Sequence, residues 1–542
     1  MKKLALFSLL LAGFFTGSAQ LERPKLVVGI VVDQMRWDYL YRYYDLYSDG
    51  GFKRMLSEGY SCGNTFINYL PSYTAVGHTS IFTGSVPAIH GIAGNSWIIT
   101  KTGKSTYCTD DSTVQTVGAG GDAGKMSPRN LLATTITDEL RLATNFQGKV
   151  VGVSLKDRAS ILPAGHNPTG AYWLDDPSGH FITSTYYKNE LPGWVSSFNQ
   201  QQLPEKLMSG QWKTLLPIDE YTQSTKDDAP WEGLLPAAKS PVFPYDLKAA
   251  YAKDKESLRE TPFGNTLTLK FAEAAVAGEA LGQDNVTDFL TINCASTDYS
   301  GHLVGPNAIE VEDVYLRLDK DLSEFFTYLD KKVGKGNYLV FLSADHGAAH
   351  AQGFMEHSKM PTGFITSLRS GLNKDLQQKF GVENLATSFS NEQVHFNQAL
   401  TEAHNIDMDA LKKETIDYLH LQPEISFVMD AANPGRSGVP EKIKEMIVNG
   451  YNKERSGAIK IVYNSGFLDS HYKTGTTHGS WYTYDTHIPL IFMGWKIPHG
   501  ETNKTLHMTD IAPTIAALLH IQMPSGCIGD PITSITDQIN GK

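Results

Sequence analysis

Cysteine is scarce in this sequence, and basic residues are outnumbered by acidic ones. Four cysteines occur in 542 residues, namely Cys62, Cys108, Cys294 and Cys527, and no two form a Cys-x-x-Cys pair. A zinc–thiolate site is therefore not expected, and no spacing favours one disulfide over another. Lys and Arg total 47 against 58 Asp and Glu, which gives a net charge of −11. This balance disfavours a general nucleic-acid binder, which would usually be basic.

Long apolar runs are missing after the N-terminus. Lys2 and Lys3 precede an apolar stretch over residues 4–15, and small residues follow up to Ala19. This pattern is typical of a secretory signal peptide, so we expect cleavage after Ala19 and a mature chain, residues 20–542, in the periplasm or the medium. The alternative is an uncleaved N-terminal anchor. No later run reaches the length of a bilayer span, so no membrane span is expected.

Hydrophobic residues make up 41% of the chain, enough for a large core, which excludes general disorder. Apolar, β-branched runs alternate with amphipathic patterns, which predicts an α/β fold with a mostly parallel sheet. The expected strands cover residues 26–32, 150–155, 289–294, 338–343 and 488–493, and the expected helices cover residues 130–144, 266–280, 309–332 and 510–519. Pro489 lies in the last strand, which fits an outer position in the sheet.

Two segments interrupt this alternation and are predicted to be caps inserted into one catalytic domain. The first covers about residues 163–245, and ten of the 25 prolines of the chain lie in it. Trp173 and Trp194 also lie there, and because large aromatics need burial, we expect an irregular cap rather than a flexible linker. The second covers about residues 354–470 and contains candidate strands at 425–429 and 459–463.

Three predicted strands are followed by an aspartate: Asp33, Asp298 and Asp345. Ligands of open α/β sheets bind at the carboxyl ends of strands, so these side chains should converge. Converging carboxylates repel one another and need cations. Taken singly, each aspartate could instead be a helix N-cap.

Three histidines accompany these carboxylates: His302, His346 and His478. Carboxylate oxygen and imidazole nitrogen without thiolate favour zinc. Asp298 and His302 are four positions apart, so they share one face if the turn is helical. Taken singly, each histidine could instead be an ordinary surface or core group.

Thr74 is a candidate nucleophile. It follows Pro71 and opens a stretch of small residues with helical character. At a helix N-terminus, free N–H groups and the helix dipole favour an anion. Two alternatives remain on sequence alone: Thr74 is only an N-cap, or Ser72 is the nucleophile.

Several segments together resemble, in order, the motifs of the alkaline phosphatase superfamily. The segment Ser154-Leu-Lys156-Asp-Arg158-Ala-Ser160 is similar to the PafA-type phosphate-monoesterases. The resemblance covers nearly the whole mature chain and implies a three-layer α/β/α fold with a central, mostly parallel sheet and inserted caps. The other motifs are Asp33-Gln-Met-Arg, Pro71-Ser-Tyr-Thr74, His90-Gly-Ile-Ala-Gly-Asn95, Asp298-x-x-x-His302, Asp345-His346-Gly, Thr477-His478 and the closing helix 509–519.

The resemblance also implies a cofactor, a reaction and site residues. Two Zn²⁺ ions would be held, one by Asp33, Thr74, Asp345 and His346, the other by Asp298, His302 and His478. Thr74, rather than Ser72, would form a phosphothreonine during hydrolysis of phosphate monoesters to inorganic phosphate. The phosphoryl oxygens would be contacted by Asn95, Lys156 and Arg158. No clear ligand set for the third, magnesium site of the better-known alkaline phosphatases is found.

Lys156 and Arg158 bear on the choice between monoesters and diesters. They are two positions apart at a strand end, so both would face one side if strand geometry persists. Two cations on the phosphoryl oxygens favour a dianionic monoester. The alternative is a solvated strand end paired with Asp157.

Other functions remain open. A nucleotide pyrophosphatase/phosphodiesterase would share the metal site and the threonine. The non-enzymatic alternative is a periplasmic zinc- or phosphate-binding protein. Such a protein would not need the Thr74 hydroxyl at the metal. A sulfatase is disfavoured because its Cys/Ser-x-Pro-x-Arg motif is missing around Thr74, and a cofactor-independent mutase is disfavoured by export. The sequence does not reveal the oligomeric state, and a monomer is the working expectation.

Overall fold

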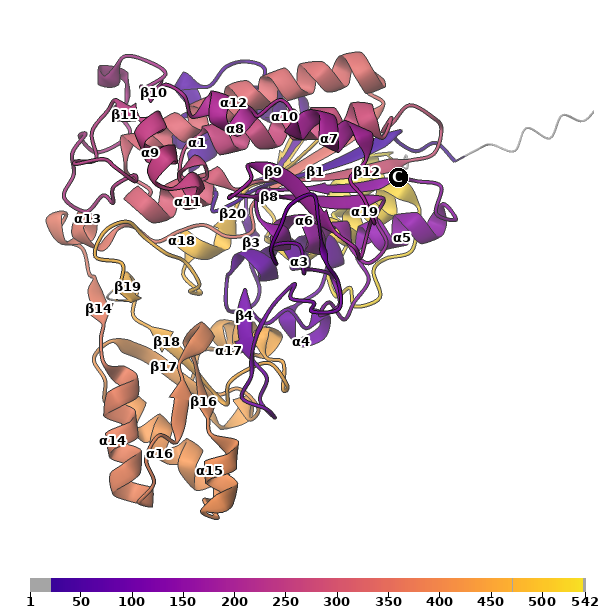
Figure 1. Cartoon of the computed structure of the whole chain (residues 1–542). Coiled ribbons are helices and arrows are strands. Elements are labelled where there is room, and N and C mark those ends of the chain that lie inside the picture. Colours follow the sequence, from indigo (N-terminus) through magenta and orange to yellow (C-terminus); the bar gives the residue numbers. More distant parts are fainter. Residues whose placement is uncertain (1–20, 470, 540–542) are drawn as a thin grey trace, which may run out of the picture.

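The computed structural model describes residues 21–469 and 471–539, so the predicted signal peptide lies outside the described residues. A ten-stranded sheet forms the centre of the molecule (Figure 1). Its strands lie in the order β22-β2-β21-β13-β1-β12-β7-β8-β9-β6, with β22 (Gly500–Thr502) at one edge. Its five middle strands run parallel. They are almost continuous runs of buried apolar residues, as strands covered on both faces must be. These strands are β13 (Tyr338–Ser343), β1 (Leu26–Val32), β12 (Asp288–Cys294), β7 (Val150–Val153) and β8 (Gly170–Asp175).

Helices cover both faces of this sheet, which confirms the three-layer α/β/α class (Figure 1). On one face lie α10 (Phe263–Gly278) and α12 (Ile309–Leu329). On the other lie α3 (Thr74–Thr83), α5 (Ile136–Ala143), α6 (Asp157–Ala164) and α19 (Ile511–Leu519). The predicted helix 130–144 begins six residues too early, because Thr135 and Asp138 form a capping box that starts α5 at Ile136.

The expectation that the strand at 488–493 lies at the outside of the sheet is wrong. Strand β21 (Leu490–Gly494) runs antiparallel between β13 and β2 (Tyr60–Cys62). Pro489 instead separates β21 from β20 (His487–Ile488), which pairs with β3 (Thr65–Phe66) in another sheet. The proline therefore sits in a break between two strands, where its missing N–H removes no ladder hydrogen bond.

Residues 163–245 do not form a single irregular cap. Strands β8 and β9 (His180–Ser184) extend the central sheet, with β6 (Thr116–Val117) at its edge. Trp173 is buried as expected, at 2% exposed, whereas Trp194 is only partly buried and packs edge-on against Tyr172. The remainder holds only short elements: α7 (Gly193–Asn199), α8 (Leu203–Leu207), β10 (Gln211–Trp212) and β11 (Tyr245–Asp246).

Residues 363–463 form a separate body, called the lobe below, that projects from the main body (Figure 1). Its sheet has the order β15-β16-β18-β17, and a core of its own lies beneath it. The predicted strands at 425–429 and 459–463 are β17 (Ile425–Asp430) and β18 (Ile459–Tyr463). The other elements are β14 (Gly363–Ile365), α14 (Leu368–Phe380), β15 (Ala386–Ser388), β16 (Gln393–Phe396), α15 (Gln398–Ala403), α16 (Met408–His420) and α17 (Glu441–Gly450).

Candidate active site

Three carboxylates meet at one edge of the central sheet. Asp33 directly follows β1, Asp345 follows β13, and Asp298 lies on α11 (Ser296–Val304), which begins just after β12. Because β13, β1 and β12 are neighbours in the sheet, their carboxyl ends lie side by side. All three side chains are buried, with exposures of 0%, 3% and 0% for Asp33, Asp298 and Asp345.

Imidazole groups join these carboxylates in two overlapping sets. The ligand atoms of Asp33, Asp345 and His346 lie within 4.8 Å of one another, and so do those of Asp298, His346 and His478. Asp33 Oδ1 and Asp345 Oδ2 are buried and accept no hydrogen bond from the described residues. Free carboxylate lone pairs beside imidazole nitrogens, with no thiolate, are the donor set of a zinc site. The residues present therefore fit a bound zinc ion.

The three histidines are oriented through their Nδ1 atoms. Each Nδ1 lies at hydrogen-bond distance from a backbone oxygen, so it carries the proton and leaves the Nε2 lone pair free. His302 Nε2 lies 3.1 Å from Asp298 Oδ1, which places this ring beside the second set. The pairs are His302 with Thr476 O at 2.8 Å, His346 with Gly347 O at 2.9 Å, and His478 with Ser72 O at 2.7 Å.

Lys156 lies between two of the carboxylates. Its Nζ is 2.8 Å from Asp33 Oδ2 and 2.6 Å from Asp298 Oδ2. Burial and the charge of Asp345 raise the pKa of Asp33 well above its ordinary value. Burial also disfavours the charged form of Asp298, but His302 and Lys156 outweigh it and lower that pKa well below the ordinary value. The pocket therefore cannot hold all its carboxylates ionised without further positive charge.

The expected geometry of Lys156 and Arg158 is wrong, and so is the solvated alternative. Strand β7 ends at Val153, and Lys156 is the N-cap of α6, so the two side chains follow a helix start rather than a strand. Lys156 is 2% exposed. Arg158 Nη1 donates to Tyr107 Oη at 3.1 Å, while Asp157 accepts from Tyr107 Oη and Thr109 Oγ1 and is not paired with either cation.

Thr74 is the first residue of α3, and its side chain is not a cap, because Tyr73 occupies the N-cap position. Its hydroxyl is buried beside the proposed ligands, with Oγ1 3.4 Å from His346 Nε2. Ser72 turns elsewhere, since its Oγ donates to Ser480 O at 3.0 Å. Asn95 is tied to the same helix start, where its Oδ1 accepts from Ala75 N at 2.9 Å.

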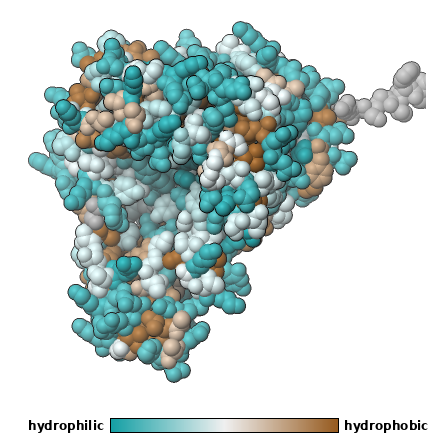
Figure 2. All heavy atoms as spheres, viewed as in Figure 1, coloured by the Kyte–Doolittle hydropathy of each residue, from teal (hydrophilic) through white to brown (hydrophobic). Residues whose placement is uncertain are grey.

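A cavity of about 510 Å³ opens onto this group of residues between the main body and the lobe, where Figure 2 shows the surface hollowed. Asn95, His302 and His478 line it on the body side, and Glu392 lies on the lobe side. Asn391 Nδ2 donates to Ser96 O at 2.8 Å across the gap. Asn391 and Glu392 both have a φ of 57°. Asparagine tolerates this left-handed conformation, whereas it is strained for Glu392, and such strain occurs often at functional sites.

Some supporting residues were missed by the sequence analysis. His78 Nδ1 lies 2.9 Å from Thr74 O and 3.3 Å from Asp345 Oδ2. Its spacing of four residues from Thr74 on one helix could have indicated it. Gln34 Nε2 donates to Asp298 Oδ1 at 2.7 Å, and no sequence signal marks that contact.

Residues 27–481 match the family model of type I phosphodiesterases / nucleotide pyrophosphatases. The chain is 58% identical to alkaline phosphatase PafA of Elizabethkingia meningoseptica, over 95% of this chain and 94% of that relative. This chain belongs to the alkaline phosphatase superfamily, as a PafA-type member. A crystal structure of wild-type PafA has 58% identity and a TM-score of 0.94, and the match covers 95% of this chain and 99% of that chain.

Two further relatives of this PafA-type chain carry informative descriptions. A second PafA crystal structure, with 57% identity and a TM-score of 0.93 over 95% of this chain and 99% of that chain, has substitutions at a threonine, an asparagine, a lysine and an arginine. A Myroides odoratus protein that is 51% identical, over 96% of each chain, is named a calcium-transporting ATPase. Within residues 21–469 and 471–539, no helix is both long and apolar enough to cross a membrane.

Asp485 joins two loops of the PafA-type site, and we expect its loss to weaken metal binding. Its Oδ2 accepts hydrogen bonds from Gly479 N at 3.1 Å and Ser480 N at 2.8 Å, in the loop that carries His478. Its backbone oxygen accepts a hydrogen bond from Gly347 N at 2.7 Å, next to His346. Asp485→Ala should lower zinc affinity about 10- to 100-fold, as loss of ligand-orienting contacts does. Competition with a chelating dye measures this. Asp469→Ala, an exposed acid of the same cavity, is the control, and equal affinities in the two variants would contradict the role.

Metal removal should destabilise the protein. Without bound cations, the buried carboxylates of Asp33, Asp298 and Asp345 repel one another. An ion that binds only the folded state stabilises it by about 4 kcal/mol at a concentration a thousand times its Kd. The melting temperature should therefore fall on chelation and recover when zinc is restored. A melting temperature that chelation leaves unchanged would refute this prediction.

Proposed function

We propose that this PafA-type chain is a zinc-dependent alkaline phosphatase that hydrolyses phosphate monoesters to inorganic phosphate through a phosphothreonine at Thr74. The observation that carries the proposal is the convergence of buried carboxylates from three neighbouring strand ends with imidazoles, beside one buried threonine hydroxyl. The name and identity of the PafA relative support it. We further propose that the protein works in the periplasm after removal of its signal peptide.

Two Zn²⁺ ions would be held by this chain. Asp33, Thr74, Asp345 and His346 would hold one, and Asp298, His302 and His478 would hold the other. Bound zinc lowers the pKa of coordinated hydroxyls and water and offsets charge on phosphoryl oxygens.

Thr74 would supply the nucleophile. Its Oγ, deprotonated, attacks phosphorus; the bond from Oγ to phosphorus forms as the ester bond breaks, and the leaving oxygen keeps the electron pair. Water then hydrolyses the phosphothreonine, which releases inorganic phosphate and restores the threonine. Burial of Thr74, at 1% exposed, limits competing water during attack.

Asn95, Lys156 and Arg158 would hold the phosphoryl oxygens that are not in line with the attack. Positive charge fixed in advance stabilises the transition state because no reorganisation is needed at the moment of reaction. Lys156 is 2% exposed, so water screens its charge little. A diester carries one charge less and offers these groups an ester oxygen, so a monoester is the better match.

The second candidate is a nucleotide pyrophosphatase/phosphodiesterase, which the description of the matching family favours. It would share Thr74 and the metal ligands but would need to accept a second ester group. A zinc- or phosphate-binding protein without turnover is the non-enzymatic candidate. The name of the Myroides relative adds ATP to the substrates worth testing.

Rates on p-nitrophenyl phosphate and bis-p-nitrophenyl phosphate, with and without chelator, separate these candidates. We expect the monoester to be cleaved far faster than the diester, and chelation to abolish both activities until zinc is added back. A faster diester rate would favour the phosphodiesterase. No cleavage of either ester by zinc-replete protein would refute the enzyme proposal.

A further inference from the structure

A second cavity, of about 630 Å³, lies between the lobe and a hairpin of the main body. The hairpin is formed by β4 (Ser96–Ile98) and β5 (Ser105–Tyr107), and its turn contributes Lys101. The lobe contributes His395 from β16, Lys412 from α16 and Lys453 from the loop after α17. Its size is that of small-molecule sites. We call it the hairpin cavity.

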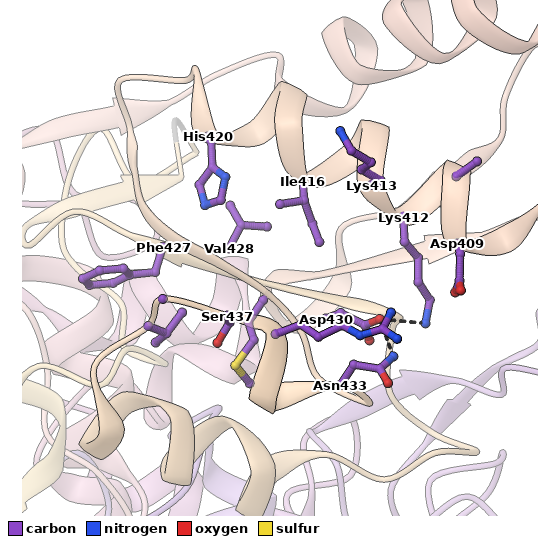
Figure 3. A pocket seen from close by; sticks show the side chains of 15 residues that line it. Asp409, Lys412, Lys413, Ile416, His420, Phe427, Val428, Asp430, Asn433 and Ser437 are labelled. Atoms are coloured by element: carbon purple, nitrogen blue, oxygen red, sulfur yellow. Dashed lines mark hydrogen bonds and ion pairs between the residues drawn. The ribbon is translucent and has the colours of Figure 1, made fainter.

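The hairpin cavity is positive in a chain that is strongly negative. Its 19 lining residues include three lysines and no Asp or Glu, although the chain carries a net charge of −11. Lys412 donates to Asp430 at 3.1 Å, and Figure 3 shows this contact from the neighbouring cavity that both residues line. Lys101 and Lys453 form no ion pair with any described residue, so their charge is available to an anion.

His395 lines this cavity and has a buried polar atom without a partner in the part of the chain that the structure describes. The side chain is 4% exposed, and its Nε2 has no hydrogen-bond partner among the described residues. Burial lowers the pKa of His395 to about 4, although a hydrogen bond to the backbone of Ser390 acts in the opposite direction. The ring is therefore neutral, and in the tautomer that carries its proton on Nδ1 the Nε2 atom is a hydrogen-bond acceptor. An unsatisfied buried acceptor is unfavourable, and a ligand hydroxyl would relieve it.

We propose that the hairpin cavity binds a phosphoryl group that carries a hydroxyl. Lys101 and Lys453 would take the charged oxygens, and His395 Nε2 would accept the hydroxyl hydrogen. Inorganic phosphate and small organic phosphates both have this chemistry, and the volume admits either. The site is separate from the reaction proposed above and does not depend on it.

An occupant of this cavity would bridge the two parts that border the candidate active site. Thr100 N donates to Glu454 O at 2.9 Å and Thr100 Oγ1 donates to Ser456 O at 3.2 Å, which already joins the hairpin turn to the lobe. The same hairpin begins next to Asn95, and the lobe reaches Ser96 through Asn391. Phosphate should therefore hold the lobe against the main body.

Equilibrium dialysis of the zinc-loaded enzyme with labelled inorganic phosphate near pH 6, where most of the phosphate is the monoanion and carries hydroxyl groups, tests the proposal. We expect Lys101→Ala/Lys453→Ala to bind one phosphate fewer per chain than the wild type, with kcat/KM on p-nitrophenyl phosphate unchanged. Lys379→Ala, a lobe lysine outside the cavity, should bind as many phosphates as the wild type. Equal numbers of bound phosphates in the wild type and the double variant would overturn the proposal.

Two further arms test the role of His395 and the source of the phosphoryl group. His395→Gln should weaken phosphate at this site by about tenfold, and sulfate, which has no proton near pH 6, should compete at least about tenfold less well than phosphate. If His395→Gln does not fold, Lys453→Arg should retain the site and Lys453→Glu should lose it. Equal competition by sulfate would refute the hydroxyl contact.

Glycerol 3-phosphate in the Thr74→Ala background distinguishes an organic phosphate from the free anion. Stronger binding than inorganic phosphate, lost in Lys101→Ala/Lys453→Ala, supports the site and assigns it to organic phosphates. If glycerol 3-phosphate binds more weakly than inorganic phosphate, and Lys101→Ala/Lys453→Ala loses this binding, the site is supported and is assigned to inorganic phosphate. Binding of either ligand that the double substitution leaves unchanged would contradict the site.

Discussion

Thr74→Ala should lower turnover of p-nitrophenyl phosphate by at least about 10⁴-fold, the scale on which loss of a nucleophile acts. The hydroxyl is buried beside His346 at the start of α3, and no other described hydroxyl occupies that position. Carboxylate and imidazole ligands would remain, so the zinc content should not change. Steady-state kinetics and metal analysis on the same preparation measure both quantities.

Ser72→Ala is the matched control for this prediction. Ser72 lies two residues away, but its hydroxyl donates to Ser480 O rather than facing the proposed ligands. We expect its activity to stay within about tenfold of wild type, as for the loss of one ordinary hydrogen bond. Labelling with a ³²P-monoester followed by acid quench should place phosphate on Thr74 in the wild type. Label on another residue, or a large loss only in Ser72→Ala, would refute the assignment.

Lys156→Ala should slow monoester cleavage about 100- to 1000-fold and diester cleavage less than about tenfold, since a buried charge on the phosphoryl oxygens is worth most to the dianion. The buried ammonium has Asp33 and Asp298 as its partners. Its loss removes positive charge from the pocket, so zinc content must be measured alongside the rates. Measuring kcat/KM of the wild type and Lys156→Ala on the two p-nitrophenyl esters shows whether the monoester rate falls more than the diester rate.

Lys149→Ala is a suitable comparison for Lys156→Ala. Lys149 precedes the same strand, β7, but its Nζ bonds Glu279 O at the opposite end. We expect Lys149→Ala to cleave both the monoester and the diester at the wild-type rate. Equal losses on monoester and diester in Lys156→Ala would mean that Lys156 serves the metal ligands alone, and the monoester preference would need another cause.

Much of the site could be predicted because its carboxylates lie at the carboxyl ends of neighbouring parallel strands. Strands rich in Val and Ile are recognisable in sequence, and parallel neighbours place their carboxyl ends together. Asp33, Asp298 and Asp345 lie at three such ends and do meet. The helical spacing of Asp298 and His302 was equally readable, and α11 brings their side chains to 3.1 Å.

Features that depend on where a strand ends were harder to predict. The strand before Lys156 ends two residues earlier than predicted and a helix follows, so side-chain directions based on strand alternation were wrong. Pro489 was placed in one outer strand, whereas two strands in different sheets meet there. Short strands β8 and β9 lie among prolines, and only the pairing of β8 with β7 and of β9 with β8 makes them part of the central sheet.

Long-range hydrogen bonds were outside the reach of sequence reasoning altogether. Asp485 supports the loops of both His346 and His478, yet its sequence surroundings resemble any helix start. Asn391 reaches Ser96 from 295 residues away. The Asn391 contact depends on how the lobe packs against the body, the Asp485 contacts depend on how two loops of the body meet, and no local pattern encodes either.

The most direct test of the two-zinc site is anomalous diffraction from crystals of the zinc-loaded enzyme, with data on both sides of the zinc absorption edge. Two peaks are predicted, one beside Thr74 with Asp33, Asp345 and His346 as ligands, the other with Asp298, His302 and His478. Loss of anomalous signal below the edge would identify both metals as zinc. Peaks elsewhere, or none at these side chains, would contradict the site on which the proposed reaction depends.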